Sequence, residues 1–195
     1  MAFGLKYENL DKYLQSYGSY IVRQAKGILK KRNDTGKLIK SLNYKITRDD
    51  RTFKIQFLNS KYGKFVNKGV SGTETTRTYV TKEGKRKRSP FKYRATSNLI
   101  ALENATGIFR KYAKRKGLKG RDRGYTKKDG TKVKGTGRFI TDKQLGFMIA
   151  SSVKKKGIKA ASFYTKPLSW SFSTFIKDLE KNLASDIKTV IQKIK

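Results

Sequence analysis

Basic and aromatic side chains alternate in the short segment 86–94, which reads Arg-Lys-Arg-Ser-Pro-Phe-Lys-Tyr-Arg. Its cations are Arg86, Lys87, Arg88, Lys92 and Arg94, and its aromatic residues are Phe91 and Tyr93. Cations hold phosphate groups while aromatic rings stack on bases, so this pattern predicts contact with a nucleic-acid backbone. The alternative is a solvated hairpin whose Phe91 and Tyr93 face the core.

A denser cluster of positive charge lies between Arg110 and Arg138, where 13 Lys and Arg stand against two Asp. Its members between these two residues are Lys111, Lys114, Arg115, Lys116, Lys119, Arg121, Arg123, Lys127, Lys128, Lys132 and Lys134. Six glycines in the same stretch favour a loop that follows an irregular backbone. The cluster predicts contact with a polyanion, without sequence specificity because phosphate contacts carry none. The alternative is a disordered loop that only aids solubility.

Residues able to catalyse a reaction are scarce. The chain has no His and no Cys, which excludes catalytic triads, thiol nucleophiles, disulfides and the usual zinc sites. Glu83-Gly84-Lys85 resembles the end of one nuclease pattern, but it lies in a predicted turn, and Asp49-Asp50 also lies in one. Gly135-Thr136-Gly137 lacks the preceding strand and the third glycine of a nucleotide fingerprint. We therefore expect no enzyme activity, no cofactor and no metal site.

The formal net charge of +34 exceeds what solubility requires. Such a field repels itself in a compact monomer unless a polyanionic partner neutralises it, and nucleic acid is the commonest such partner. Part of the excess has a second explanation, because lysine greatly outnumbers arginine and an AT-rich genome favours lysine codons. The charge predicts nucleic acid as the partner, ahead of an anionic membrane or an acidic protein surface.

The elements at the two ends of the chain carry the apolar periodicity. Residues 5–32 predict a helix with an apolar stripe at Leu10, Tyr13, Leu14, Tyr17, Ile21, Ala25, Ile28 and Leu29. Alternation over 44–47 and 53–57, on either side of the polar turn 48–51, predicts a hairpin of two half-buried strands. A last helix is predicted from Leu168 to Lys195, where five Lys nearly balance three acidic residues.

The middle of the chain predicts smaller elements. Lys82-Glu83-Gly84-Lys85 and Asp129-Gly130 are typical of hairpin turns, and one helix is predicted from Leu99 to near Gly117. Thr141 and Gln144 match a capping box that opens a further helix, which ends at Gly157.

These elements predict an α+β fold with a small antiparallel sheet packed against long N- and C-terminal helices. The core domain comprises 1–73 and 157–195, and 74–156 is a basic insertion of hairpins with one or two helices. No apolar run approaches the roughly 18–20 residues of a membrane span, and 1–6 leads into a polar stretch and not a signal-peptide core. We expect a soluble protein made in a cytoplasm, with no membrane partner.

Three aromatic residues mark the start of the last helix: Trp170, Phe172 and Phe175. Residues of this type are commonly part of a core. In a ring subunit, part of this aromatic face is shared with a neighbour, so these residues are candidates for a subunit interface.

Short segments around the hairpin occur in a distinctive order. The first helix leads to Thr-Gly-Lys-Leu-Ile-Lys-Ser-Leu at 35–42, the hairpin leads to Tyr-Gly-Lys-Phe-Val-Asn-Lys-Gly at 62–69, and an aromatic segment ending at Pro167 precedes the last helix. This order over about 1–73 and 157–195 resembles the tail-completion and neck-protein family of tailed bacteriophages. Two features depart from the family pattern: Asn67 stands where the family often has an acid, and the link from Gly72 to Lys166 is long.

The resemblance implies a structural virion protein assembled in the host cytoplasm. It implies a ring of six- or twelve-fold symmetry in the head–tail connector, between portal, adaptor or tail proteins, with a basic surface that faces DNA or an acidic neighbour. The alternative function is a free nucleic-acid-binding protein without sequence specificity, which needs no ring.

Overall fold

The computed structural model describes residues 7–32, 34–49 and 52–194, and it has the α+β fold expected from the sequence. The chain forms two compact units. The first comprises the described residues up to Gly69, Thr78–Pro90 and those from Lys159 onward, and the second comprises Val70–Arg77 and Phe91–Ile158. None of the described helices combines the length and apolarity that crossing a membrane demands.

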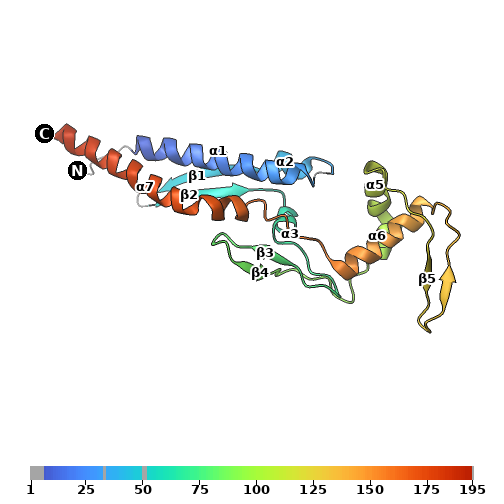
Figure 1. Ribbon diagram of the computed structural model, residues 1–195. Helices are drawn as coiled ribbons and strands as arrows, with labels where there is room; N and C mark the ends of the chain where they lie inside the picture. Colours follow the sequence, from blue (N-terminus) through green and yellow to red (C-terminus); the bar gives the residue numbers. More distant parts are fainter. Residues whose placement is uncertain (1–6, 33, 50–51, 195) are drawn as a thin grey trace. The chain divides into compact units, whose positions relative to one another are not determined.

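The described residues of the first unit form two long helices, two hairpins and two short helices. In chain order these are α1 (Glu8–Lys30), α2 (Lys37–Ser41), β1 (Asn43–Asp49), β2 (Thr52–Leu58), α3 (Gly63–Lys68), β3 (Thr78–Val80), β4 (Arg86–Arg88) and α7 (Thr165–Ile194). Figure 1 shows α1 and α7 side by side, with the β1–β2 hairpin running along them. The long terminal helices and the small antiparallel sheet are therefore confirmed.

The core of the first unit forms around α1. Six of the eight predicted stripe residues are buried, whereas Tyr13 and Ile28 are half-buried; Ile21 and Ala25 have no exposed surface at all (0%). Phe163, also 0% exposed, packs against them from the segment just before α7, and Ile55 and Phe57 of β2 join the same cluster. Burying this apolar surface is what holds the helices and the hairpin together.

The β1–β2 register pairs Asn43 with Leu58 at the open end of the hairpin. The predicted turn is shorter than expected, because the strands continue to Asp49 and from Thr52, and Asp50 and Arg51 lie outside the described residues. The hydroxyl of Tyr164 closes the open end, lying 2.8 Å from the carbonyl oxygen of Leu58 and 3.3 Å from that of Asn43. Burial raises the pKa of Tyr164 to about 12, so the phenol keeps its donor proton at neutral pH.

Asn67, which stands where the resembled family often has an acid, contacts the segment just before α7 through two hydrogen bonds. Its side-chain oxygen accepts a hydrogen bond from the backbone N–H of Tyr164 (3.1 Å), and its carbonyl oxygen accepts one from Ser162 (2.9 Å). The side-chain amide of Asn67 thus tethers the segment before α7 without adding a charge.

The second unit holds three helices and one hairpin: α4 (Leu99–Thr106), α5 (Ile108–Arg115), β5 (Gly124–Thr126), β6 (Lys132–Lys134) and α6 (Asp142–Lys156). Helix α5 packs on α6, where the small residues Ala113, Gly146 and Ala150 are buried and let the helices approach closely. The capping box at Thr141 is confirmed, with Gln144 N–H donating to the Thr141 hydroxyl and the Gln144 side chain accepting from the Thr141 N–H. The helix ends at Gly157, as predicted.

The single helix predicted from Leu99 to near Gly117 is wrong. The chain breaks at Gly107, whose φ of +60° lies in the left-handed region that favours glycine. The carboxylate of Glu103 accepts hydrogen bonds from the N–H groups of Phe109 (2.6 Å) and Arg110 (3.2 Å), so it caps the start of α5. Apolar spacing does not reveal the break, because the residues on both sides keep the same period.

The boundaries of the units differ from the insertion expected at 74–156. The β3–β4 hairpin belongs to the first unit, where β3 packs on α3 and the Val80 N–H donates to the Ser162 hydroxyl (3.2 Å). The second unit instead begins at Val70 and ends at Ile158, and these two residues pair in an antiparallel bridge. Backbone pairing therefore sets the division, and charge composition does not.

The N-terminus of α1 is capped by a residue from the far end of the chain. The Asp186 carboxylate, buried on α7, accepts hydrogen bonds from the Leu10 N–H (2.9 Å), the Asn9 N–H (3.0 Å) and the Asn9 side-chain amide (2.8 Å). A carboxylate at this position satisfies otherwise unpaired N–H groups and complements the positive end of the helix dipole.

We expect Asp186→Ala to lower the free energy of unfolding by about 1–2 kcal/mol, because it removes a cap and leaves buried N–H groups without acceptors. Urea unfolding measures the change. The control is Glu180→Ala, which removes the same charge from an exposed position of α7 and should change stability by about 0.5 kcal/mol or less. Equal losses in the two variants would contradict the capping role.

Candidate functional site

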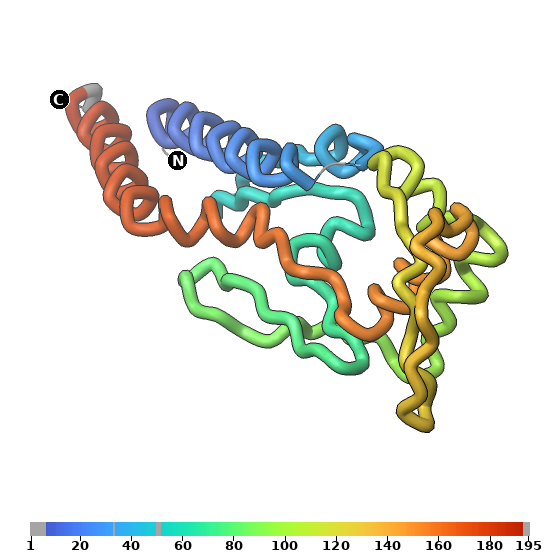
Figure 2. Tube along the Cα trace, turned by 45° about the vertical axis from the view of Figure 1, so that its right-hand side comes forward, coloured from blue at the N-terminus to red at the C-terminus, as the bar shows by residue number. Residues whose placement is uncertain are grey.

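The densest cationic segment forms an ordered two-stranded ribbon. Beyond the β5–β6 pairing, the backbone continues to pair through Asp122 N–H to Arg138 oxygen (2.9 Å) and Ile140 N–H to Gly120 oxygen (3.0 Å). We call residues 119–140 the basic ribbon; Figure 2 traces it between α5 and α6. The structure therefore shows a paired ribbon at these positions, and not the disordered loop considered as the alternative.

One acidic residue fixes the base of the basic ribbon. The Asp122 carboxylate accepts hydrogen bonds from the backbone N–H of Thr136 (2.9 Å), the N–H of Gly124 (2.9 Å) and the Thr136 hydroxyl (3.0 Å). These hydrogen bonds, the one from the Thr136 backbone first, hold the pKa of Asp122 below its ordinary value of 3.8. The carboxylate therefore stays ionised at neutral pH and ties both strands together.

Two glycines allow the strands to meet. A Cβ on Gly124, whose φ is +79°, would collide with the carbonyl oxygen of Val133, and one on Gly135 would collide with the backbone of Gly124. The glycines predicted to favour an irregular loop instead permit a close backbone crossing.

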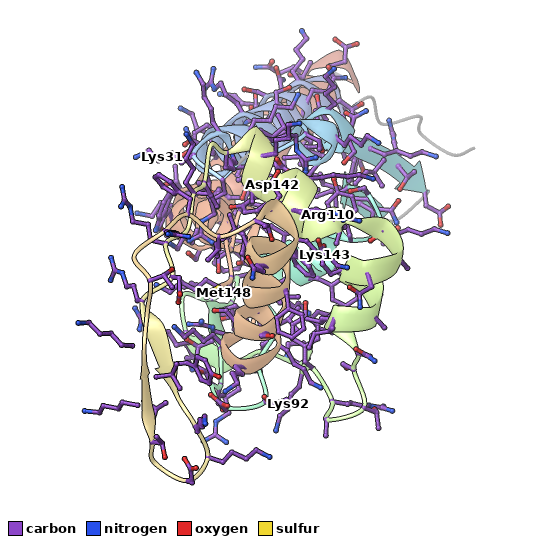
Figure 3. The ribbon with its side chains drawn as sticks, turned by 90° about the vertical axis from the view of Figure 1, so that its right-hand side faces the viewer. Lys31, Lys92, Arg110, Asp142, Lys143 and Met148 are labelled. Carbon is purple, nitrogen blue, oxygen red and sulfur yellow. The ribbon has the colours of Figure 1, made fainter. Side chains whose placement is uncertain are left out.

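The cations of this region are exposed. The predicted contact residues of this unit lie on α5 and its end (Lys114, Arg115, Lys116), on the basic ribbon (Lys119, Arg121, Arg123, Lys127, Lys128) and in the segment after Phe91 (Lys92, Arg94), and all ten are exposed. Figure 3 shows long side chains that end in nitrogen projecting from the ribbon and helices of this unit. A fixed scaffold with outward cations suits a polyanion backbone.

The other predicted cations belong to a different unit. Arg86, Lys87 and Arg88 form β4, where all three are exposed. Lys87 lies opposite Tyr79 in the register, and the Lys68 ammonium lies 5.6 Å from the centre of the Tyr79 ring. The structure thus divides the predicted contact set between two units.

Phe91 and Tyr93 do not offer free ring faces. Both side chains are half-buried, and burial raises the pKa of Tyr93. The strand around them pairs with Ser71, through Ser71 N–H to Phe91 oxygen (2.7 Å) and Tyr93 N–H to Ser71 oxygen (2.9 Å). Their burial favours the alternative in which these rings pack inward, and it removes them as base-stacking candidates.

The first unit carries an open apolar groove of about 620 Å³ between α1, β2 and α7. It is lined by Tyr7, Leu10, Leu14, Tyr17, Phe53, Ile55, Phe57, Lys82, Leu168, Phe172, Phe175, Leu179 and Leu183. Phe172 is 52% exposed there, although it belongs to the apolar stripe of α7. We call this feature the α1–α7 groove; it is apolar surface that the monomer leaves in water.

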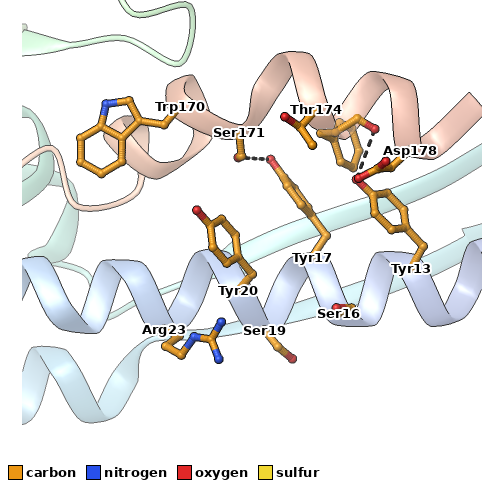
Figure 4. Close-up of a pocket in the computed structure, with 11 residues that line it drawn as sticks. Tyr13, Ser16, Tyr17, Ser19, Tyr20, Arg23, Trp170, Ser171, Thr174 and Asp178 are labelled. Atoms are coloured by element: carbon orange, nitrogen blue, oxygen red, sulfur yellow. Dashed lines mark hydrogen bonds between the residues drawn. The ribbon is translucent and has the colours of Figure 1, made fainter.

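A second hollow, of about 520 Å³, lies beside it on α1 and α7. Figure 4 shows Tyr13, Tyr17 and Tyr20 of α1 facing α7, with the Tyr17 and Ser171 hydroxyls 3.0 Å apart. Burial, and then the nearby Asp178 carboxylate, raise the pKa of Tyr13 to about 12. This polar aromatic hollow has the adjoining Trp170 in its lining.

The three predicted interface residues have different environments. Phe175 packs on Tyr17 with ring centres 4.3 Å apart and is largely a core residue, as the alternative had it. Phe172 and Trp170 (63% exposed) are available at the surface. The sequence could not separate them, because all three lie within two turns of one helix.

The described residues contain no group of three His, Cys, Asp or Glu able to hold a metal ion. Glu83 lies in the β3–β4 turn with its carboxylate 4.0 Å from the Lys82 ammonium. Comparisons with protein-family models, with curated proteins and with solved structures find no match to this chain.

We expect Lys127, Lys128, Lys132 and Lys134 changed together to Glu to weaken binding to all DNA sequences alike. These side chains are exposed, so the fold should persist. If each holds one phosphate, the slope of log affinity against log salt should fall by about 4. Fluorescence anisotropy across a salt series measures it.

The control for total charge changes Lys12, Lys26, Lys30 and Lys40 to Glu, which are exposed residues of α1 and α2. An equal loss in both quadruple variants would show that net charge, and not the basic ribbon, controls binding.

Proposed function

We propose that this chain is a non-enzymatic structural subunit of a phage head–tail connector that assembles into a ring of six- or twelve-fold symmetry. The observation that carries the proposal is the α1–α7 groove, an open apolar hollow with a volume of about 620 Å³ on the first unit. A ring needs heterologous interfaces, in which one surface of a subunit covers a different surface of the next. The groove has the apolar and aromatic lining typical of the buried centre of such an interface.

A second copy of this chain is the occupant that the charge distribution favours. The chain as a whole carries +34, so most faces repel another copy. Helix α7 carries little of this excess, because from Leu168 onward the chain has five Lys and three acidic residues. Exposed apolar residues continue along it at Phe172, Ile176, Ile187 and Ile191. Contact through α7 therefore brings little like charge together.

The order of elements supports the same proposal. Helix α1, the short α2 over Thr-Gly-Lys-Leu-Ile-Lys-Ser-Leu, the β1–β2 hairpin, the short α3 and the long α7 follow in the order of the resemblance to tail-completion and neck proteins. In such a ring the basic surfaces face DNA or an acidic neighbouring protein of the portal, adaptor or tail, and the subunit belongs to the virion.

A second candidate function is a free nucleic-acid-binding protein without sequence specificity. The basic ribbon favours it, because its cations are held outward on an ordered scaffold. Oligomeric state separates the candidates: a free binder is a monomer or dimer, whereas a connector subunit forms closed rings alone or with its neighbours.

We expect Phe172→Glu to abolish ring formation, because a charge in the α1–α7 groove opposes its burial against a neighbour. Light scattering and negative-stain imaging measure assembly, alone and with portal or tail partners. The matched control is Ser173→Glu, which adds the same charge to an exposed position that lines neither hollow. Circular dichroism should show both variants folded.

Monomers from the unchanged protein, both alone and with connector partners, would rule out the ring. Rings that persist in Phe172→Glu would place the interface elsewhere than the α1–α7 groove.

We also expect no cleavage of DNA in the presence of Mg²⁺ or Mn²⁺. The reason is the missing catalytic residue types and the turn position of Glu83. Incubation of plasmid DNA with purified protein measures it, and cleavage that disappears in Glu83→Ala would overturn the non-enzymatic proposal.

A further inference from the structure

Two aromatic rings on the basic ribbon are exposed, in contrast to Phe91 and Tyr93. Phe139 is 61% exposed and Tyr125 is 65% exposed. At this exposure each ring buries only part of its surface against the protein and leaves most of it open to a ligand. Aromatic rings among cations are the arrangement that holds unpaired bases.

The Phe139 ring is held in place by cations. Arg121 pairs with Phe139 across the basic ribbon, and its guanidinium carbon lies 4.4 Å from the ring centre. The Lys119 ammonium lies 5.9 Å from the same centre, and the Arg121 guanidinium also donates to the Gly137 carbonyl oxygen (3.3 Å). A guanidinium stacked on a phenyl ring presents both a planar stacking surface and a phosphate partner.

Tyr125 lies in β5, farther along the basic ribbon than the Arg121–Phe139 pair. It pairs with Val133 in β6, and Lys132 and Lys134 flank that position on the same strand. Tyr125 lies four positions after Arg121, beyond the turn of the backbone at Gly124. Asp122 and the glycines fix the backbone that carries both residues.

We propose that the basic ribbon binds single-stranded nucleic acid, with unpaired bases stacked on Phe139 and Tyr125 and phosphates held by the surrounding Lys and Arg. The proposal rests on the polyanion contact proposed above and names its ligand, but it does not depend on ring formation. A duplex hides the faces of its bases, and phosphate contact alone requires no exposed ring. Stacking without hydrogen bonds to base edges tolerates any sequence.

The test uses the full chain and three fluorescent probes of equal length: oligo-dT, the same strand with abasic sites, and a duplex. Phe139→Leu and Tyr125→Leu together keep apolar bulk but remove both aromatic faces. We expect this double variant to bind oligo-dT about 10- to 100-fold more weakly, with no change for the abasic strand. The unchanged protein should bind oligo-dT more tightly than the abasic strand at the same salt.

Two controls separate stacking from charge and from folding. Phe147→Leu alters another exposed Phe of the same unit, on α6, and should leave oligo-dT affinity unchanged. Lys132→Gln should weaken oligo-dT and the abasic strand equally. Circular dichroism and thermal unfolding report whether each variant keeps its fold.

Equal affinity of the unchanged protein for oligo-dT and the abasic strand would overturn the proposal. The proposal also fails if the duplex binds more tightly than oligo-dT and the double variant binds every probe as tightly as the unchanged protein does. That result would indicate a purely electrostatic contact with duplex DNA. If none of the probes binds and inorganic polyphosphate also fails to bind, the polyanion contact itself falls, while ring formation remains a separate question.

Discussion

The packing of α7 on α1 is the constraint on which the first unit depends. It joins segments more than 150 residues apart, and Asp186 of α7 supplies the cap that the start of α1 lacks in its own sequence. The same approach brings Phe163 and Tyr164 onto the core and onto the open end of the β1–β2 hairpin. Because these contacts are long-range, the hairpin and α1 acquire their final environment only when the end of the chain has docked.

The two units use buried carboxylates in the same way. Asp186 caps α1 and Glu103 caps α5, and each side chain is almost fully buried among backbone N–H groups. In a chain with 48 Lys and Arg and 14 acidic residues, some of the few acids are thus used to order the backbone, and Glu103 also lies 3.7 Å from the Arg110 guanidinium. Asp122 has the same role on the basic ribbon, where its hydrogen bonds fix two strands that carry many cations.

The sequence predicts what depends on local spacing. The stripe of α1, the alternation of β1 and β2, the turn at Asp129-Gly130 and the capping box at Thr141 all follow from neighbours within a few positions. The division at Gly107, the assignment of the β3–β4 hairpin to the first unit and the exposure of Phe139 do not. The break at Gly107 involves Glu103, only six positions before Phe109, but apolar spacing does not mark it. The placement of the hairpin depends on Ser162 before α7, and the exposure of Phe139 depends on the lack of a covering side chain.

Charge and aromatic residues have to be considered together in judging the basic ribbon. A disordered basic tail also binds phosphate by releasing counter-ions, so affinity that falls with salt does not distinguish it from an ordered surface. An ordered ribbon can, in addition, hold a ring in water beside a cation, as Arg121 holds Phe139. Stacking adds a contribution that salt does not screen, since it arises from contact between ring faces and not from charge. Binding that persists at high ionic strength would therefore distinguish an ordered stacking surface from a disordered basic tail. If that salt-independent binding is lost when the Phe139 side chain is removed, it comes from the aromatic ring of Phe139.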